Sequence, residues 1–169
     1  MNYKNSGKSL EARLEKVNST YQAKNIAMLR KADPPSKTIT IRGKKVHMLL
    51  ANPFPDFIGV WTEKNGKALF IEAKSTMKPL LPIFQKSGGL TAKQISYMLE
   101  WNKAGGCVGI VWEYDLKWKF ISIDQVIRTS LEKRGKSYRR SIKWEECKDI
   151  RPTRGVLIDY LANVSSAYF

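Results

Sequence analysis

Two short apolar segments on either side of Asn65-Gly66 are the feature that most constrains the fold of this 169-residue chain. Asn-Gly is the dipeptide most typical of a tight hairpin turn, so residues 57–61 and 67–73 are predicted to be paired strands. Asp56 precedes the first strand, and Glu72 and Lys74 end the second. All three are therefore expected at the open end of one hairpin. Because strand side chains alternate between faces, Glu72 and Lys74 should point the same way.

Two carboxylates and an ammonium are the groups required for metal-assisted cleavage of a phosphodiester. Asp56 and Glu72 would supply the hard oxygen ligands that suit Mg²⁺, for which Mn²⁺ can substitute. The metal would orient a water and lower its pKa, and Lys74 would stabilise the charge of the transition state. An exposed ion pair between two strands explains the same spacing, and spacing alone does not separate the two explanations.

The charge of the chain favours the metal site. With 30 Lys and Arg residues against 15 Asp and Glu, the formal net charge is +15, which is the sign that attracts nucleic acid. An acidic pair among apolar strands would repel such a ligand unless a cation intervened. Residues 37–45 and 133–143 are basic runs that contain no acid. The candidates for DNA contacts are Lys8, Arg13, Lys37, Arg42, Lys44, Lys45, Lys136, Arg139, Arg140 and Lys143.

Other features restrict the class of protein. Cys107 and Cys147 are isolated and His47 is the only histidine, so neither a disulfide framework nor a structural zinc site is predicted. No apolar run approaches the roughly 20 residues of a membrane span, and the polar N-terminus lacks the apolar segment of a signal peptide. We therefore expect no membrane partner and a cytoplasmic location. The length is most simply that of one domain over residues 1–169.

The remaining pattern predicts a mixed α/β fold, with a central mixed sheet flanked by helices. The predicted elements are a helix capped by Ser9 and carrying Leu10, Leu14, Val17 and Tyr21, a strand at 25–31, a two-stranded projection at 38–50, an irregular stretch at 78–89, a helix from Thr91 to about 104, strands at 107–112 and 118–123, and helices at 124–132 and 158–167. Thr91 and Gln94 form a capping-box pattern. The basic tip of the projection would reach DNA, although a solvated hairpin that discourages edge pairing explains it too.

This order of elements is that of the PD-(D/E)xK nucleases, whose core resembles restriction endonucleases. Within them the chain resembles the RecU-type Holliday junction resolvases of Gram-positive bacteria and their phages, so that a phage-encoded member is one option. The residues that carry the resemblance are Gly7-Lys8-Ser9-Leu10-Glu11, Asn18, Tyr21, Asn25-Ile26-Ala27, Asp33-Pro34-Pro35, Asp56-Phe57-Ile58-Gly59-Val60, Phe70-Ile71-Glu72-Ala73-Lys74, Gln94, Met98, Ile158-Asp159-Tyr160 and Tyr168-Phe169.

The resemblance implies a homodimer that binds a four-way DNA junction and, with Mg²⁺, nicks two opposed strands. It implies that Asp56, Glu72 and Gln94 belong to the metal site and that Lys74 is the transition-state lysine. It also implies that Glu11 assists the metal or its water, although the dipole of the first helix explains an acid there equally well. Residues 36–52 correspond to a projecting stalk of the family. A recombinase or a branch-migration helicase is left open as a further partner.

The function predicted from the sequence is a metal-dependent, structure-selective endodeoxyribonuclease that resolves Holliday junctions in DNA recombination and repair. Two alternatives remain. One is a restriction or repair endonuclease of the same fold that acts on duplex or flap DNA. The other is a non-catalytic basic DNA-binding protein.

Overall fold

The computed structural model describes residues 6–32, 36–49, 54–85 and 88–169, and its centre is a six-stranded sheet. The strand order is β1-β4-β5-β7-β8-β12, in which β5 and β7 are parallel and the other neighbours are antiparallel. These strands are β1 (Met28–Lys31), β4 (Phe57–Trp61), β5 (Lys67–Ser75), β7 (Cys107–Tyr114), β8 (Lys117–Ser122) and β12 (Lys148–Asp149). β7 lies inside the sheet between β5 and β8 and is buried almost throughout.

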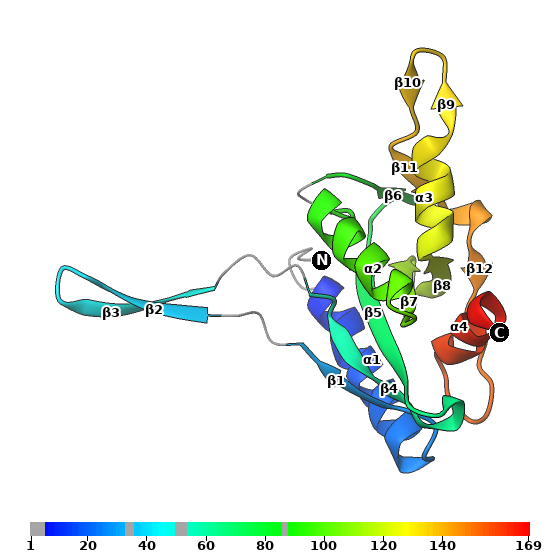
Figure 1. Cartoon of the computed structure of the whole chain (residues 1–169), viewed down its shortest axis with the longest axis horizontal. Helices are drawn as coiled ribbons and strands as arrows, with labels where there is room; N and C mark the ends of the chain where they lie inside the picture. Colours follow the sequence, from blue (N-terminus) through cyan, green and yellow to red (C-terminus); the bar gives the residue numbers. More distant parts are fainter. Residues whose placement is uncertain (1–5, 33–35, 50–53, 86–87) are drawn as a thin grey trace.

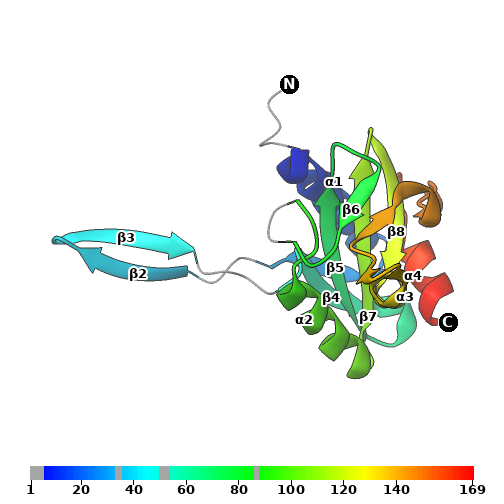
Figure 2. The ribbon, with the colours of Figure 1, turned by 90° about the horizontal axis from the view of Figure 1, so that it is seen from above.

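Helices cover both faces of this sheet, which confirms the predicted mixed α/β fold (Figure 2). One face packs against α1 (Ser6–Ala23) and α4 (Tyr160–Tyr168), and the other against α2 (Ala92–Lys103) and α3 (Ile123–Leu131). The predicted apolar stripe of α1 is buried. The prediction of Ser9 as the cap was wrong, because the helix already begins at Ser6. Among the described residues, no helix combines the length and the apolar character needed to cross a membrane.

The predicted hairpin is formed by β4 and β5. Its register pairs Phe57 with Ile71 and Trp61 with Lys67. The short helical turn η2 (Thr62–Lys64) leads into the connection, where Asn65 and Gly66 have φ angles of 54° and 72°. These left-handed conformations are the ones that Asn and Gly adopt at low cost.

A close backbone contact holds β1 beside β4. A Cβ atom on Gly59 would lie only 1.9 Å from the carbonyl oxygen of Met28, so this approach requires glycine. The contact extends past the end of β1, where the Ala32 amide donates a hydrogen bond to the carbonyl oxygen of Asp56 at 2.9 Å. The end of β1 is therefore fixed next to Asp56.

The predicted projection is an antiparallel ribbon of β2 (Ser36–Ile41) and β3 (Lys44–Leu49) that extends away from the sheet (Figures 1 and 2). Arg42 and Gly43 form its turn with φ angles of 50° and 74°. The parts of the prediction at residues 50–52, and the Asp33-Pro34-Pro35 segment, lie outside the described residues.

Two further ribbons were not predicted. Within the stretch predicted to be irregular, β6 (Leu80–Pro82) pairs with β11 (Ser141–Lys143). The second ribbon joins β9 (Lys133–Arg134) to β10 (Ser137–Tyr138) and projects from the end of α3 (Figure 1). The prediction of an irregular stretch was wrong at β6, because its strand partner lies far away in the sequence and leaves no local pattern. The turn η3 (Trp144–Glu146) follows β11.

Asp159, just before α4, joins the two ends of the fold. Its fully buried carboxylate accepts hydrogen bonds from the Tyr21 hydroxyl at 2.8 Å and from Arg154 Nε at 2.9 Å, and another from the Thr153 hydroxyl. Burial alone would raise the pKa of Asp159, but these hydrogen bonds outweigh it and hold the pKa below its ordinary value. The ionised carboxylate is therefore the form that the fold stabilises.

We expect Asp159→Ala to lower the free energy of unfolding by about 3 kcal/mol at pH 7, because it leaves buried donors without their acceptor. Urea unfolding would measure this. Since the folded pKa is depressed, the contribution is present above the unfolded value of about 4 and is lost as the pH falls through the folded pKa. Asp149→Ala is the control, because its carboxylate is 61% exposed and pairs with Lys119 at the surface. A loss below about 1 kcal/mol for both variants would contradict the prediction.

Candidate active site

The hairpin brings Asp56 and Glu72 to the same end of the sheet, as the sequence predicted. Asp56 immediately precedes β4, and its Oδ2 accepts a hydrogen bond from the Ala73 amide at 2.7 Å. Glu72 lies within β5 and is only 1% exposed. The strand register therefore places one carboxylate across from the other.

The two carboxylates are held in an environment that resists negative charge. Burial raises the pKa of Asp56, although the Ala73 hydrogen bond and the Lys74 charge act against that rise. Burial also raises the pKa of Glu72, to about 7, and the charge of Asp56 adds to this rise. Such a pair is stabilised by a nearby cation.

Lys74 supplies one such cation. Its Nζ lies 2.5 Å from Glu72 Oε1, so the two side chains share a face of β5 as predicted. Burial alone would lower the pKa of Lys74, but the charges of Glu72 and Asp56 outweigh it and the pKa is raised. The side chain is therefore a fixed ammonium. When both carboxylates are ionised, one ammonium leaves a net negative charge, which a further cation would neutralise.

Gln94 reaches this cluster from the first turn of α2. Its Oε1 accepts from the amide and the hydroxyl of Thr91, each at 3.1 Å, and completes the predicted capping box. Its Nε2 donates to Glu72 Oε1 at 2.7 Å. The side chain thus caps α2 and orients Glu72 at the same time. In this arrangement its oxygen faces the helix cap and its amino group faces the carboxylate.

Glu11 and Lys31 flank the cluster. Glu11 Oε2 on α1 lies 2.7 Å from Lys31 Nζ, and Glu15 Oε1 lies 3.4 Å from the same nitrogen. The charge of Glu11 contributes to the raised pKa of Asp56 and of Glu72, which places Glu11 within electrostatic reach of both. Lys31 has the opposite effect on Asp56.

Sequence reasoning missed Lys31. The residue ends β1 and pairs with Phe57, the neighbour of Asp56. The signal that would have found it is the antiparallel pairing of β1 with β4, which no local pattern specifies.

The donor set fits Mg²⁺. Among the described residues, no three His, Cys, Asp or Glu side chains gather as a metal-binding group. Asp56 and Glu72 form a pair of hard oxygen donors, and Mg²⁺ is commonly bound through one or two carboxylates while it keeps several waters. Burial is the main cause of the raised pKa values of the pair, so a cation bound between the two carboxylates would offset the cost of keeping both ionised.

Several predicted DNA-contacting residues lie at the surface. Arg42, Lys44 and Lys45 are exposed at the turn of the stalk, and Lys136 is exposed between β9 and β10. The Arg140 guanidinium stacks 5.3 Å from the centre of the Phe84 ring. Lys143 pairs loosely with Glu145 at 3.7 Å. The side chains of Lys8 and Lys37 lie outside the described part of the chain.

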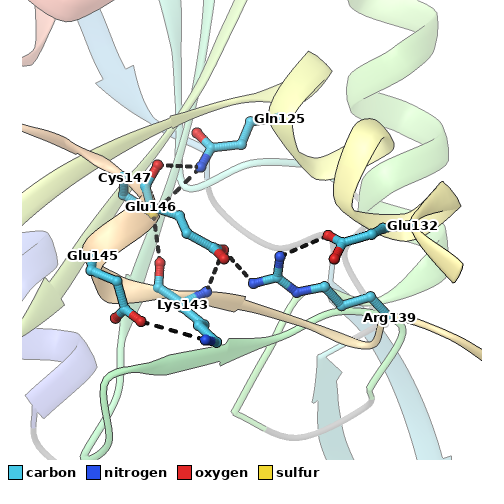
Figure 3. Close-up of polar contacts among 7 residues, drawn as sticks. All are labelled: Gln125, Glu132, Arg139, Lys143, Glu145, Glu146 and Cys147. Carbon is cyan, nitrogen blue, oxygen red and sulfur yellow. Dashed lines mark hydrogen bonds and ion pairs between the residues drawn. The ribbon is translucent and has the colours of Figure 1, made fainter. Parts of the chain in front are cut away.

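Arg13 and Arg139 are placed differently from the other candidates. Arg13 pairs with the buried carboxylate of Glu113 on β7. Arg139 is 7% exposed and pairs with Glu132 and Glu146 (Figure 3). Both guanidinium groups are thus occupied within the fold. For Arg139 the acid-free run did not indicate this, because its partners Glu132 and Glu146 lie outside residues 133–143.

The chain belongs to the RecU family, since the family model described as "Recombination protein U" matches residues 5–166. This confirms the family that the sequence predicted, which is one of Holliday junction resolvases and hence of nucleases that act on branched DNA. The chain is also similar to the solved structure of Hjc, a Holliday junction resolvase from the archaeal hyperthermophile Archaeoglobus fulgidus. The two share 14% identity over 82% of this chain and 95% of the other, with a TM-score of 0.49. A comparison with curated proteins found no match.

Proposed function

We propose that this chain is a Mg²⁺-dependent endodeoxyribonuclease that resolves Holliday junctions by paired nicks in DNA recombination and repair. The observation that carries the proposal is the buried carboxylate of Glu72 with the half-buried carboxylate of Asp56 across from it and the ammonium of Lys74 beside it. Membership of a resolvase family supports the same reading. A cluster of this kind at the end of a hairpin has the groups that phosphodiester hydrolysis needs.

Each side chain has a separate role in this proposal. Asp56 and Glu72 would hold Mg²⁺, which when bound supplies a Lewis acid for the phosphate and an acidified water. Lys74 would stabilise the charge that develops on the phosphate oxygens. Gln94 would keep the Glu72 carboxylate in place and reach the metal through water. Glu11, whose carboxylate pairs with Lys31, would help to orient the water.

Paired nicks require two active centres, so we propose that two copies of the chain act together on one junction. The exposed cations of the stalk turn would contact phosphates, which positions the protein without reading the base sequence. We expect the protein to act in the cytoplasm of a bacterial or phage-infected cell, where a recombinase or a branch-migration helicase would be a further partner.

The test is one cleavage assay with Mg²⁺ on a mobile four-way junction, a flap and a linear duplex, with Asp56→Ala and Asp149→Ala compared with wild type. We expect symmetric nicks in opposed strands of the junction, lost in Asp56→Ala while binding persists and retained in Asp149→Ala. Equal cleavage of linear duplex would instead indicate a restriction or repair endonuclease. Cleavage that survives Asp56→Ala would reject the assigned site, and binding without any cleavage would indicate a non-catalytic protein.

A further inference from the structure

The β9–β10 ribbon carries a concentration of positive charge. Lys133, Arg134 and Lys136 are exposed on it, and the ring of Tyr138 is 49% exposed. Within the described part of the chain, no carboxylate forms an ion pair with these three cations. The ribbon projects from the end of the domain where α2 begins (Figure 1). Free cations on a projecting ribbon at this end are available to a polyanion.

The base of the ribbon is fixed by Arg139. Its backbone amide donates to the carbonyl oxygen of Glu132 at 2.9 Å, and its guanidinium binds the carboxylates of Glu132 and Glu146 (Figure 3). The Glu146 carboxylate also accepts from the Lys143 amide at 3.1 Å. One buried guanidinium thus ties the end of α3, the base of the ribbon and η3 together. A ribbon with two-residue strands is not stable by itself, so its direction depends on this anchor.

The same base is packed against the segment that leads to the active site. The Ile83 amide donates to the carbonyl oxygen of Arg140 at 2.9 Å, and the Arg140 side chain covers Phe84. β11, which follows the ribbon, pairs with β6. At the end of β6, the carbonyl oxygen of Pro82 accepts a hydrogen bond from the Leu90 amide at 2.9 Å. Gln94 follows in the first turn of α2 and binds Glu72. A series of hydrogen bonds and one strand pair therefore connects the base of the ribbon, β6 and Glu72.

We propose that the β9–β10 ribbon binds the phosphate backbone of the duplex arm next to the cleaved strand, and that Arg139 is a positioning residue that sets the site of the nick. The proposal rests on the proposed function, since it presupposes a junction substrate. Duplex DNA fits because its phosphates are the dense negative charge that exposed Lys and Arg bind, and its major groove admits a two-stranded ribbon. Arg139 contributes to binding through the ribbon, because its own charge is satisfied by two carboxylates.

The first test neutralises the ribbon. A variant with Lys133→Ala, Arg134→Ala and Lys136→Ala is compared with Lys16→Ala, Lys24→Ala and Lys103→Ala, which removes the same charge from exposed sites on α1, at its C-terminal end and on α2. Junction binding is measured in EDTA over a series of salt concentrations, so that no cleavage occurs. The ribbon variant should reduce the log–log salt slope by roughly 2–3 more than the control, since each phosphate contact contributes about 0.9.

The second test locates the contact. Hydroxyl-radical footprinting of the wild type on a junction should show protection within one arm beside the nick, and the ribbon variant should lose that protection alone. An unchanged footprint and a salt slope equal to that of the control would overturn the proposal and leave the ribbon as a surface for an acidic protein. If the wild type protects the arm but cuts no junction, the proposed function fails while the contact stands.

The third test concerns Arg139. Arg139→Met keeps the ribbon cations and removes the anchor, so nicks should spread over neighbouring phosphodiesters while the salt slope stays within about one contact of the wild-type value. Arg139→Lys retains a cation between the two carboxylates, so most of its nicks should fall at the single wild-type position. If Arg139→Met does not fold, Arg139→Lys is tested in its place. A single wild-type nick position in every folded variant would overturn the positioning role, since a purely structural change alters amount and not position.

Discussion

Glu72→Gln should slow junction cleavage by at least about 10²–10³-fold and leave junction binding intact or slightly tighter. Gln keeps the shape of the side chain but removes one of the two anionic ligands proposed for Mg²⁺, and the loss of one preorganised charge-stabilising group typically has this effect. Binding should not weaken, because the change removes negative charge near a polyanion. Single-turnover cleavage rates and binding in EDTA would measure the two effects separately.

The same substitution should stabilise the metal-free protein at high pH. The folded pKa of Glu72, about 7, exceeds the unfolded value of about 4.3, so the folded state holds this proton more tightly. The free energy of unfolding therefore falls as the pH rises from about 4.3 to 7. Above that range the full cost of ionising the buried Glu72 carboxyl is present. At pH 8, Glu72→Gln should be more stable by about 2 kcal/mol, with Lys74 left unpaired as the opposing effect. Near pH 5 the difference should shrink.

Thermal unfolding at pH 5 and pH 8, with and without Mg²⁺, would check this. Mg²⁺ should stabilise the wild type at pH 8 and have much less effect on Glu72→Gln, because a ligand stabilises only the state that binds it. Glu145→Gln is the matched control, since its carboxylate is 67% exposed and pairs with Lys143 at the surface. A lower melting temperature of Glu72→Gln at pH 8 would show that the ion pair with Lys74 outweighs burial.

Local patterns were enough to predict the frame of this site. The apolar stripe of α1 and the two faces of β5 are properties of short segments, and each is found as predicted, since Leu69 and Ile71 join one core cluster and Phe70 the other. The turn signal at Asn65-Gly66 was enough to predict that Asp56 and Glu72 lie at the same open end of the hairpin, and the register of β4 and β5 places them across from each other. The geometry of Glu72 and Lys74 required nothing beyond the two-residue period of a strand.

What the sequence did not predict depends on contacts between distant segments. Lys31 enters the site because β1 pairs with β4, and β6 is a strand only because β11 lies beside it. Arg139 was grouped with the basic surface because no acid stands near it in its run, yet Glu132 and Glu146 lie just beyond the ends of that run. Burial and pairing of this kind are decided by tertiary packing.

Gln94 illustrates a different limit. The sequence predicted that Gln94 forms a capping box with Thr91, and in the structure the same side chain also contacts Glu72. The amide oxygen completes the cap with Thr91, and the amide nitrogen binds Glu72. A side chain with a donor end and an acceptor end can serve two partners, which a one-residue, one-role reading of a sequence overlooks.

Lys74→Gln should also reduce cleavage by about 10²–10³-fold, but for a reason that metal titration can separate from the effect of Glu72→Gln. Lys74 Nζ pairs with Glu72 Oε1 at 2.5 Å, so the ammonium competes with a metal cation for the same carboxylate. Removing the ammonium should therefore leave the Mg²⁺ concentration for half-maximal cleavage unchanged or lower. Glu72→Gln should raise that concentration, because it removes an anionic ligand.

Stability gives a second, independent criterion. Lys74→Gln leaves Glu72 buried without its closest cation, so the metal-free variant should be less stable than wild type at pH 8. Adding Glu72→Gln to Lys74→Gln should restore stability without restoring cleavage, and the non-additivity of the two changes would measure their coupling. If Lys74→Gln is destabilised yet cuts at the wild-type rate, Lys74 is only the counter-ion of Glu72. Another cation must then stabilise the charge on the phosphate. Lys31 on β1 is the candidate, because its charge acts on Asp56.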